Sequence, residues 1–401
     1  MTAPIVVVGA GLTAGKAVEG LREAGHDGPV IVYGDETLPP YERPPLSKSY
    51  LAGGSTLADA TVHEQSWYDE HGIELRLGSK VQELDVAGNR VVTQSGSQEF
   101  SKLLLATGAA PRRLGLADRS DAPVTYLRAV GDSDRIRGAL VEGARIAVIG
   151  GGWIGLEVAA TARQAGAEVT VVESFDLPLL RVLGHEVAKV FAELHREHGV
   201  DLRLGAQVTE IERRGKLGAV HLMDGTVLEA DLMVVGIGAL PNTGLAERAG
   251  LPIENGVVVD EHLRTSHPDV YAAGDVASAW HPVLGTRIRV EHWDNAIGQG
   301  TLAGRNLAGR EEVYDRLPYF YTDQYDFGME YLGHVGPEGY DEVVLQGDPH
   351  GSRQFRAFWL RDDVVLAGMH ANDWDAMDPI RSVVGRPADR GRLSGDQPLA
   401  G

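Results

Sequence analysis

Cysteine is absent from all 401 positions of the chain. Enzymes that reduce disulfides or peroxides through a thiol need at least one cysteine, so this class of redox chemistry is excluded. Thiolate ligation of an iron–sulfur cluster by this chain is excluded for the same reason.

Positive charge is scarce as well, with 37 Lys and Arg against 57 Asp and Glu and a formal net charge of −20. Nucleic acids and anionic membranes attract basic surfaces, so we expect neither as a partner. No apolar run reaches the length of about 18 residues that a membrane span requires. The first four residues also lack the basic region of a signal peptide. We therefore expect a cytoplasmic protein.

Glycine, in contrast, is abundant, at 51 of 401 residues, and follows no collagen-like period. We interpret the excess as tight turns and loops that approach a ligand. A chain of this length exceeds one ordinary core, so two or three domains are expected.

Two segments, residues 5–14 and 146–155, share one pattern: a β-branched run ends in glycines and leads into a helix. Such a turn lets the backbone approach a pyrophosphate, while the next helix aims its unpaired N–H groups at that charge. The residues expected at these turns are Gly9, Gly11, Thr13 and Ala14 in the first copy, and Gly150, Gly152, Ile154 and Gly155 in the second.

An acidic residue that accepts a hydrogen bond from an adenosine ribose is expected about 20 positions after each turn. Asp35 fills this place in the first copy, with Glu36 beside it as an alternative, and Glu173 fills it in the second. The sequence thus predicts two bound dinucleotides.

The second copy is inserted into the first. We expect one dinucleotide-binding domain over 1–110 and 239–315, a second over 111–238, and a C-terminal α+β domain over 316–401.

Four finer expectations concern local structure. The proline pairs of 38–48 predict no regular structure, and residues 299–307 predict a helix. The Gly- and Pro-rich tail from Arg386 is expected to be poorly ordered. His195 and His198 lie three apart in a predicted helix among charged residues, so we expect a solvated face, and no histidine pair has metal-ligand spacing.

Motifs along nearly the whole chain resemble the FAD-dependent NADH:ferredoxin reductases that supply cytochromes P450 and aromatic-ring dioxygenases. They are residues 5–14, 44–48, 106–108, 150–157, 236–238, 273–275, 290–296 and 320–324. The resemblance implies a glutathione-reductase-like pair of Rossmann-like domains, FAD and NAD as cofactors, and a [2Fe-2S] ferredoxin as partner. A cytochrome P450 or Rieske dioxygenase would be the indirect partner.

The resemblance also implies further cofactor contacts. They are Arg43, Val81, Ala106, Thr107, Gly108, Arg128, Gly236, Gly238, Gly274, Asp275, Glu291, His292, Trp293 and Tyr321. Asp275 would hold the ribityl chain, and Trp293 would lie against the isoalloxazine. The alternative is a surface arginine for Arg128, a solvated loop charge for Arg43 and a plain N-cap for Asp275. It is a core tryptophan for Trp293, and core packing for Tyr321 and its neighbour Phe320.

Lys48 and Glu157 are the candidate catalytic residues. Lys48 resembles the family lysine that reaches the flavin, where an ammonium stabilises the negative charge of the reduced ring. A buried ammonium needs a partner, and Glu157, expected on the first turn of the helix after the second glycine turn, is placed to provide it. A carboxylate that only favours the helix dipole is the alternative for Glu157.

Glu173 predicts a preference for NADH over NADPH. A 2′-phosphate about 4 Å from its carboxylate would be repelled by roughly 4 kcal/mol per unit charge at an effective dielectric of about 20. Ser174, Phe175 and Asp176 follow without a compensating cation.

Two other functions are compatible with these residues. One is NADH-driven reduction of a small acceptor, such as monodehydroascorbate or a quinone. The other is an apoptosis-inducing-factor-like, redox-responsive interaction protein. For an acidic ferredoxin, the candidate basic patch is Arg287, Arg289, Arg305 and Arg310.

Overall fold

The computed structural model describes residues 3–395 and 397–399, and the chain divides into two compact units. Unit 1 comprises Met1–Arg43, Leu57–Ala110 and Ala239–Pro318. Unit 2 comprises Pro44–Thr56, Pro111–Gly238 and Tyr319–Gly401.

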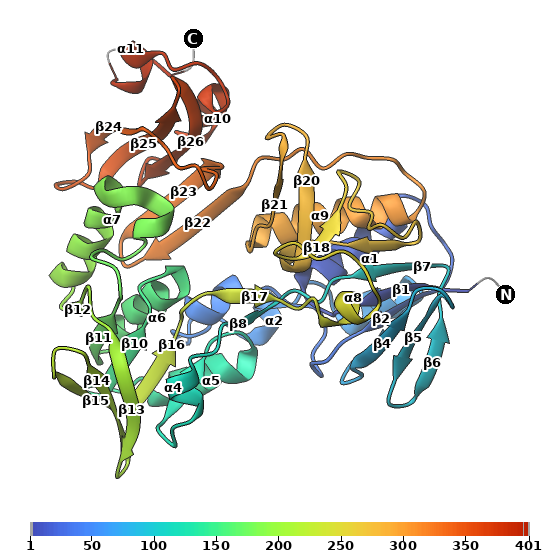
Figure 1. The fold of residues 1–401 in the computed structure, drawn as a ribbon, viewed down its shortest axis with the longest axis horizontal. Coiled ribbons are helices and arrows are strands. Elements are labelled where there is room, and N and C mark those ends of the chain that lie inside the picture. Colours follow the sequence, from blue (N-terminus) through green and yellow to red (C-terminus); the bar gives the residue numbers. More distant parts are fainter. Residues whose placement is uncertain (1–2, 396, 400–401) are drawn as a thin grey trace. The chain divides into compact units, whose positions relative to one another are not determined.

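Unit 1 is built on a parallel five-stranded sheet in the order β19-β7-β1-β2-β3. These strands are β19 (Val270–Ala272), β7 (Lys102–Leu105), β1 (Ile5–Val8), β2 (Val30–Tyr33) and β3 (Ile73–Arg76). Figure 1 labels β7, β1 and β2 of this sheet. Every residue of β1 and β2 is buried, as expected for apolar strands covered on both faces.

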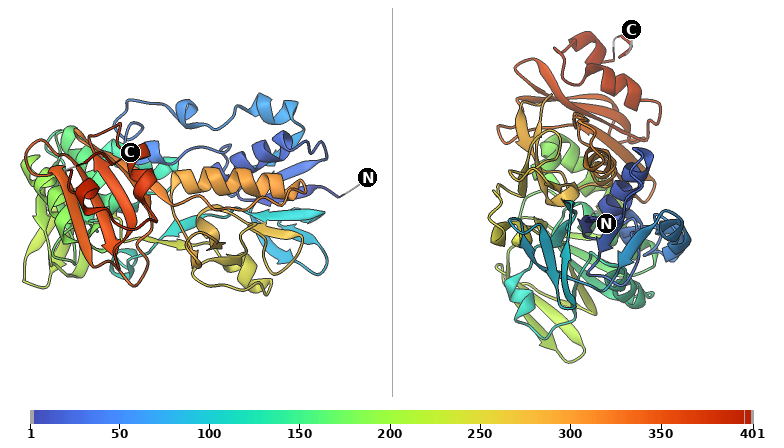
Figure 2. Two further views of the ribbon diagram at one scale, coloured as in Figure 1. Left: turned by 90° about the horizontal axis from the view of Figure 1, so that it is seen from above. Right: turned by 90° about the vertical axis from the view of Figure 1, so that its right-hand side faces the viewer.

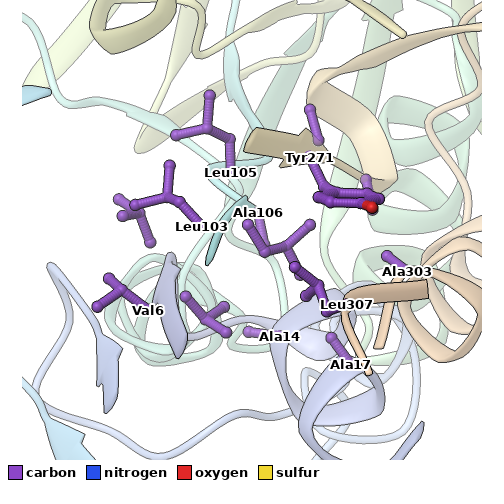
Figure 3. Packing of buried hydrophobic residues seen from close by; sticks show 14 of the residues in the cluster. Val6, Ala14, Ala17, Leu103, Leu105, Ala106, Tyr271, Ala303 and Leu307 are labelled. Atoms are coloured by element: carbon purple, nitrogen blue, oxygen red, sulfur yellow. The ribbon is translucent and has the colours of Figure 1, made fainter. Parts of the chain in front are cut away.

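Helices α1 (Leu12–Glu23) and α9 (Trp293–Leu307) lie side by side in unit 1. Small residues allow this close approach: a Cβ on Gly304 would lie 2.0 Å from the carbonyl oxygen of Ala17. Ala14, Ala303 and Leu307 belong to the same buried cluster (Figure 3). The close packing holds the start of α1 in a fixed position next to the ends of the strands.

Smaller elements complete unit 1. They are helices α2 (Leu57–Ala60), α3 (Gln65–Glu70) and α8 (Gly244–Arg248), the sheet of β4 (Val81–Asp85), β5 (Arg90–Thr93) and β6 (Gly96–Glu99), the sheet of β18 (Val257–Val259), β20 (Ala277–His281) and β21 (Thr286–Ile288), and the 3-10 turn η2 (Gly274–Val276). β8 (Ala109–Pro111) pairs with β17 (Ala239–Pro241) where the chain leaves and re-enters this unit.

Unit 2 contains a second parallel sheet, in the order β12-β11-β10-β16-β9. Its strands are β12 (Asp201–Arg203), β11 (Glu168–Val172), β10 (Arg145–Ile149), β16 (Leu232–Val235) and β9 (Val124–Tyr126). This part of unit 2 also contains four helices, α4 (Gly115–Asp118), α5 (Val130–Ala139), α6 (Trp153–Gln164) and α7 (Leu180–Glu197). It further contains an antiparallel sheet of β13 (Val208–Arg214), β14 (Leu217–Leu222) and β15 (Val227–Ala230).

The C-terminal part of unit 2 is an antiparallel sheet in the order β22-β23-β26-β25-β24. Its strands are β22 (Tyr319–Gln324), β23 (Phe327–Gly333), β26 (Val364–Ala371), β25 (Gln354–Arg361) and β24 (Glu342–Asp348). Figure 2 shows these orange and red strands with α10 (Met377–Val383) against them. The buried Trp359 donates its indole N–H to the carbonyl of Leu183 in α7, so this sheet is anchored to the second Rossmann-like domain.

This architecture confirms the predicted α/β fold with two Rossmann-like domains and a C-terminal α+β domain, which is an antiparallel sheet with two short helices among the described residues. Among the described residues, no helix has the length and apolar character needed to cross a bilayer. The same residues contain no group of His, Asp and Glu that could hold a metal ion.

Several local expectations were wrong. Pro44–Ser47 forms a 3-10 turn, η1, because proline is compatible with the start of a helical turn. α9 begins at Trp293, six positions before the predicted start, because the His292 side chain accepts a hydrogen bond from the Asp294 N–H and caps the helix.

The tail beyond Arg386 is folded within the residues that are described. Asp389 caps α11 (Arg390–Leu393), and Leu393 is buried. His195 is also buried, at 0% exposure, because it lies on the inner face of α7, so the predicted solvated face was wrong for this residue.

Candidate dinucleotide-binding sites

The turn after β1 has the geometry of a phosphate cradle. Gly9 has φ +114°, and a Cβ there would lie 2.1 Å from the carbonyl oxygen of Ala106, so only glycine fits. Gly11 is the N-cap of α1, and a Cβ there would meet no atom within 4 Å. Open space thus faces the start of a helix that has no side-chain cap and no acidic residue in its first turn. An anion fits there, because the unpaired helix N–H groups can bind it.

The turn after β10 repeats this geometry in unit 2. Gly150 has φ +109°, and its Cβ would lie 2.3 Å from the carbonyl oxygen of Gly236. Gly152 is the N-cap of α6, again without a side-chain cap, and the nearest atom to a Cβ there is 3.9 Å away. A Cβ on Gly155 would lie 2.2 Å from the carbonyl oxygen of Gly150, so this third glycine permits the close helix–strand contact. Its counterpart in unit 1 is the fully buried Ala14. Ile154 is 46% exposed at this turn.

A third turn in unit 1 brings Gly274 and Asp275 to the start of α1. Gly274 has φ +77°, and a Cβ there would lie 2.3 Å from the Thr13 hydroxyl oxygen. Its N–H donates to Gln299 Oε1 at 2.8 Å. Asp275 follows in η2 and is half-buried. Thr13 and Gly274, predicted from distant segments, are therefore neighbours at one edge of the sheet.

Gln299 was missed by the sequence analysis, as was Asn242. Asn242 exchanges hydrogen bonds with Thr107 and donates its backbone N–H to the carbonyl of Gly108. The chain positions of these two residues carry no motif, and only the folded structure brings them to the predicted turns.

Two acidic residues follow β2, and the structure distinguishes them. Glu36 accepts hydrogen bonds from Tyr41 at 2.7 Å and from Arg43 at 2.9 Å. Asp35 pairs with Lys80 at 2.6 Å, and both side chains are mostly exposed. Glu36 is thus held by two donors of its own unit, whereas Asp35 has one partner among the described residues and is the more exposed of the two carboxylates, at 64% against 37%. Val81, at the start of β4, is buried.

The remaining predicted residues of unit 1 lie at the start of α9. Glu291 pairs with Arg289, His292 caps the helix, and Trp293 is its first residue. Arg128 belongs to unit 2, between β9 and α5, where its backbone N–H donates to Asp132 at 3.0 Å.

Glu173 follows β11 directly and is anchored in its loop. Its Oε2 accepts from the Gly151 N–H at 2.6 Å, and its Oε1 accepts from the Phe175 N–H at 2.9 Å. The carboxylate therefore lies beside the glycine turn of unit 2, where an adenosine ribose is expected. The structure also brings Arg181 over the Phe175 ring, 5.6 Å from its centroid. This cation was missed because it lies eight residues further along the chain than Glu173.

Lys48 and Glu157 form a buried ion pair in unit 2. The distance from Lys48 Nζ to Glu157 Oε1 is 2.7 Å, and the two side chains are 19% and 7% exposed. Lys48 Nζ also lies 5.5 Å from the centroid of the Tyr321 ring. The predicted place of Glu157 on the first turn of its helix was wrong, because α6 begins at Trp153 and Glu157 is its fifth residue. A simple helix-dipole role therefore does not explain this carboxylate.

Phe320 is half-buried in unit 2, stacked on Tyr331 at 4.5 Å and beside Trp153 at 5.1 Å between ring centroids. The proposed basic patch is largely neutralised within unit 1. Arg287 pairs with Glu254, Arg289 with Glu291, and Arg305 with Glu23 and Glu312.

Comparison with known proteins places this geometry in a family. Residues 3–300 match the pyridine nucleotide-disulphide oxidoreductase family, and residues 319–392 match a reductase C-terminal domain. The chain is 39% identical to the anthranilate 1,2-dioxygenase system ferredoxin–NAD(+) reductase component of Burkholderia cepacia, over 90% of this chain and 88% of that protein. It is 38% identical to putidaredoxin reductase of Pseudomonas putida, over 90% of this chain and 87% of that one.

The fold is similar to a solved structure, the covalent putidaredoxin reductase–putidaredoxin complex. The TM-score is 0.94 at 35% identity, covering 99% of this chain and 97% of that chain. Two glycine cradles, a reductase C-terminal domain and these relatives lead to one conclusion: the chain belongs to the pyridine nucleotide-disulphide oxidoreductases, in the family of FAD-dependent ferredoxin–NAD(+) reductases.

Proposed function

We propose that this protein transfers electrons from NADH through FAD to a [2Fe-2S] ferredoxin that supplies a cytochrome P450 or a ring-hydroxylating dioxygenase. The observation that carries the proposal is the near-complete match to ferredoxin reductases, including the C-terminal reductase domain. When bound, FAD accepts a hydride from NADH and releases its electrons singly.

The cradle of unit 1 is the proposed FAD site. Gly9 and Gly11 would admit the pyrophosphate to the start of α1, Asp35 would accept from the ribose, and Asp275 would hold the ribityl chain. The other proposed contacts within unit 1 are Thr13, Ala14, Arg43, Val81, Ala106, Thr107, Gly108, Gly274, Glu291, His292 and Trp293. For Arg128 and Tyr321, which belong to unit 2, the family resemblance alone supports a cofactor contact. Support comes from the open space at Gly11 and from the contact between Gly274 and Thr13.

The cradle of unit 2 is the proposed NADH site. Gly150, Gly152, Ile154 and Gly155 would bind the pyrophosphate, with Gly236 and Gly238 at the neighbouring strand end. Glu173 would accept from the adenosine ribose and repel a 2′-phosphate. We further propose a cytoplasmic location, where NADH is the available reductant.

Lys48 would stabilise negative charge on the reduced flavin, and Glu157 would offset the cost of burying the ammonium. The distance of 2.7 Å between them supports these roles, as do the hydrogen bonds that Ser47 and Thr322 donate to the Glu157 carboxylate. The absence of cysteine is consistent with electron transfer through FAD alone, without a thiol.

A steady-state assay tests the proposal. FAD-loaded protein and NADH are combined with a panel of [2Fe-2S] ferredoxins and, separately, with monodehydroascorbate and quinones. We expect rapid, salt-sensitive reduction of at least one ferredoxin, because charged surfaces steer such encounters. Turnover with small acceptors alone, insensitive to salt, would favour the first alternative, and a long-lived reduced complex without turnover would favour the second.

A further inference from the structure

A chain of buried polar side chains leads away from the Lys48–Glu157 pair inside unit 2. Thr322 Oγ1 donates to Glu157 Oε1 at 2.7 Å, and Gln324 Nε2 donates to Thr322 Oγ1 at 3.1 Å. Gln324 Oε1 lies 2.8 Å from His195 Nε2. Thr322 and Gln324 are 1% exposed and His195 is 0% exposed. These contacts connect α6, β22 and α7 through side chains alone.

The donor and the acceptor of each hydrogen bond between Glu157 and His195 are fixed. A carboxylate only accepts, so the Thr322 hydroxyl must donate its one proton to Glu157. The hydroxyl oxygen is then free to accept from the amide nitrogen of Gln324, and the amide oxygen must accept from a protonated Nε2 of His195. Turning the amide around would place its oxygen against the Thr322 oxygen with no proton between them. His195 Nδ1 is left as an acceptor, 3.4 Å from the Tyr325 hydroxyl.

The hydrogen-bonded side chains of Thr322, Gln324 and His195 carry no charge, so the Lys48–Glu157 pair is the only charged part of this network. Burial lowers the pKa of His195 to about 4, so the imidazole is neutral near pH 7. A neutral, fully satisfied network of this kind fixes the orientation of the group at its end, since each unmade hydrogen bond would leave a buried polar atom without a partner.

Glu157 is held from three directions. Ser47 donates to Oε2 at 2.5 Å, while Lys48 and Thr322 share Oε1. The segment that carries Lys48 is itself tied down, because Thr161 donates to the Ser47 carbonyl at 2.9 Å. Among these contacts, only the one from Thr322 comes from the C-terminal sheet.

We propose that Thr322, Gln324 and His195 form a positioning relay that locks the Glu157 carboxylate and thereby holds the Lys48 ammonium in place. These three residues act through Glu157 and are not themselves catalytic. The meaning of the relay for electron transfer rests on the proposed function, whereas its effect on Lys48 does not.

Two variants of Thr322 separate the hydroxyl from the packing. Thr322→Val keeps the shape and removes the donor, whereas Thr322→Ser keeps the donor and removes a methyl group. The flavin-loaded protein is treated with limiting acetic anhydride, and acetylation of Lys48 is measured by peptide mass spectrometry. The exposed Lys216 serves as the internal reference.

The relay predicts that Lys48 is acetylated about tenfold faster relative to Lys216 in Thr322→Val, because a charge-assisted hydrogen bond to Glu157 is lost. Thr322→Ser should stay within about twofold of the unmodified protein. Two results would overturn the relay, because they would mean that packing alone matters. Lys48 could be acetylated faster in Thr322→Ser than in Thr322→Val, or its rate in Thr322→Val could equal that of the unmodified protein.

A second variant covers the case in which Thr322→Val fails to fold. Gln324→Met has a similar length and no hydrogen-bonding amide, so Lys48 should again be acetylated faster, by about threefold, because the Thr322 hydroxyl loses its orientation. Unchanged acetylation in a variant with an unchanged melting temperature would also overturn the relay.

Flavin reduction by saturating NADH, followed in the same variants, gives the functional readout. It should slow in Thr322→Val and remain normal in Thr322→Ser. If the unmodified protein is not reduced by NADH, the proposed function fails, while the acetylation result still decides the relay. If the protein is reduced normally and Lys48 acetylation does not respond, the relay fails and the proposed function stands.

Discussion

Glu173 combines a structural contact in its loop with a proposed role in nucleotide selectivity. Its two oxygens accept backbone N–H groups from Gly151 and Phe175, so the carboxylate is held beside the glycine turn. A fixed negative charge discriminates against a second one more strongly than a mobile charge would, because it does not move away at low cost. Arg181 lies nearby and is the group that would attract a 2′-phosphate once this repulsion is removed.

Glu173→Gln tests this assignment. The amide keeps one acceptor for the loop and removes the charge, so the ratio of kcat/KM for NADH over NADPH should fall by about tenfold or more. Steady-state reduction of a ferredoxin with each nucleotide measures the ratio. Adding Arg181→Ala to Glu173→Gln should lower kcat/KM for NADPH again. Similar kcat/KM values for both nucleotides in the unmodified protein would refute the role of Glu173.

Lys48→Met should slow flavin reduction by NADH while FAD stays bound. The change removes an ammonium and leaves the Glu157 carboxylate buried with only neutral donors, Ser47 and Thr322. Stopped-flow absorbance of the flavin measures the rate, and the spectrum before mixing measures bound FAD. The matched control is Lys48→Met with Glu157→Gln, which removes both charges. An unchanged rate in Lys48→Met would exclude Lys48 from the reaction.

His195 predicts how stability depends on pH. Burial lowers its pKa from about 6.5 to about 4, so the unfolded chain binds a proton in this range that the folded protein does not. The contribution is therefore fully present above about pH 6.5 and is lost as pH falls to about 4, amounting to roughly 3 kcal/mol. Chemical unfolding at several pH values should show this slope. His195→Gln, which does not titrate, should flatten it, and an equal slope in both proteins would contradict the assignment.

At the scale of elements, the turn after β1 contains one glycine that the fold requires, Gly9, and one that the fold does not require, Gly11. Gly9 is required by the protein itself, since a Cβ there would lie 2.1 Å from the Ala106 carbonyl oxygen. Gly11 faces open space, so the fold itself does not require a glycine there, and we expect a ligand to come close at this position.

Gly11→Ala should therefore fold with a nearly unchanged melting temperature and lose FAD, whereas Gly9→Ala should lower the melting temperature of the protein itself. Circular dichroism and the flavin-to-protein absorbance ratio measure the two effects. Normal FAD binding by Gly11→Ala, or an equal fall in melting temperature in both variants, would show that the two glycines do not have these separate roles.

The elements that the sequence predicted best are those with a local cause. The strand–turn–helix units at Gly9 and Gly150 follow from glycine backbone freedom and apolar periodicity, which lie within a few residues. The start of α9 was missed because its cap is a histidine, His292, which is not among the usual N-cap residues. The ordered tail was missed because Leu393 finds its place only against the completed sheet.

The candidate site divides in the same way. Lys48 and Glu157 could be predicted as partners from the family motifs, although 109 positions separate them in the chain. No local pattern indicated the contacts of Thr322 with Glu157 or of Gln324 with His195, because they depend on where β22 packs in unit 2. Tertiary packing of this kind overrides the surface pattern that made His195 resemble a solvated residue.

For the whole molecule, charge bears on the choice of partner. The net charge is −20, and three of the four arginines first considered for ferredoxin docking are paired with carboxylates of their own unit. An acidic ferredoxin would find little free positive charge at these three. A docking surface therefore has to be sought by measurement, with salt dependence as its signature.

We propose that one chain binds FAD and NADH in two separate cradles and passes electrons from the nicotinamide to the flavin. An anaerobic titration of the purified, FAD-loaded protein with NADH decides whether it does. We predict about one FAD per chain and complete loss of the oxidised flavin absorbance at about one NADH per FAD, since a hydride carries both electrons. A protein that binds no FAD when the flavin is supplied, or whose bound flavin stays oxidised in excess NADH, would refute this function.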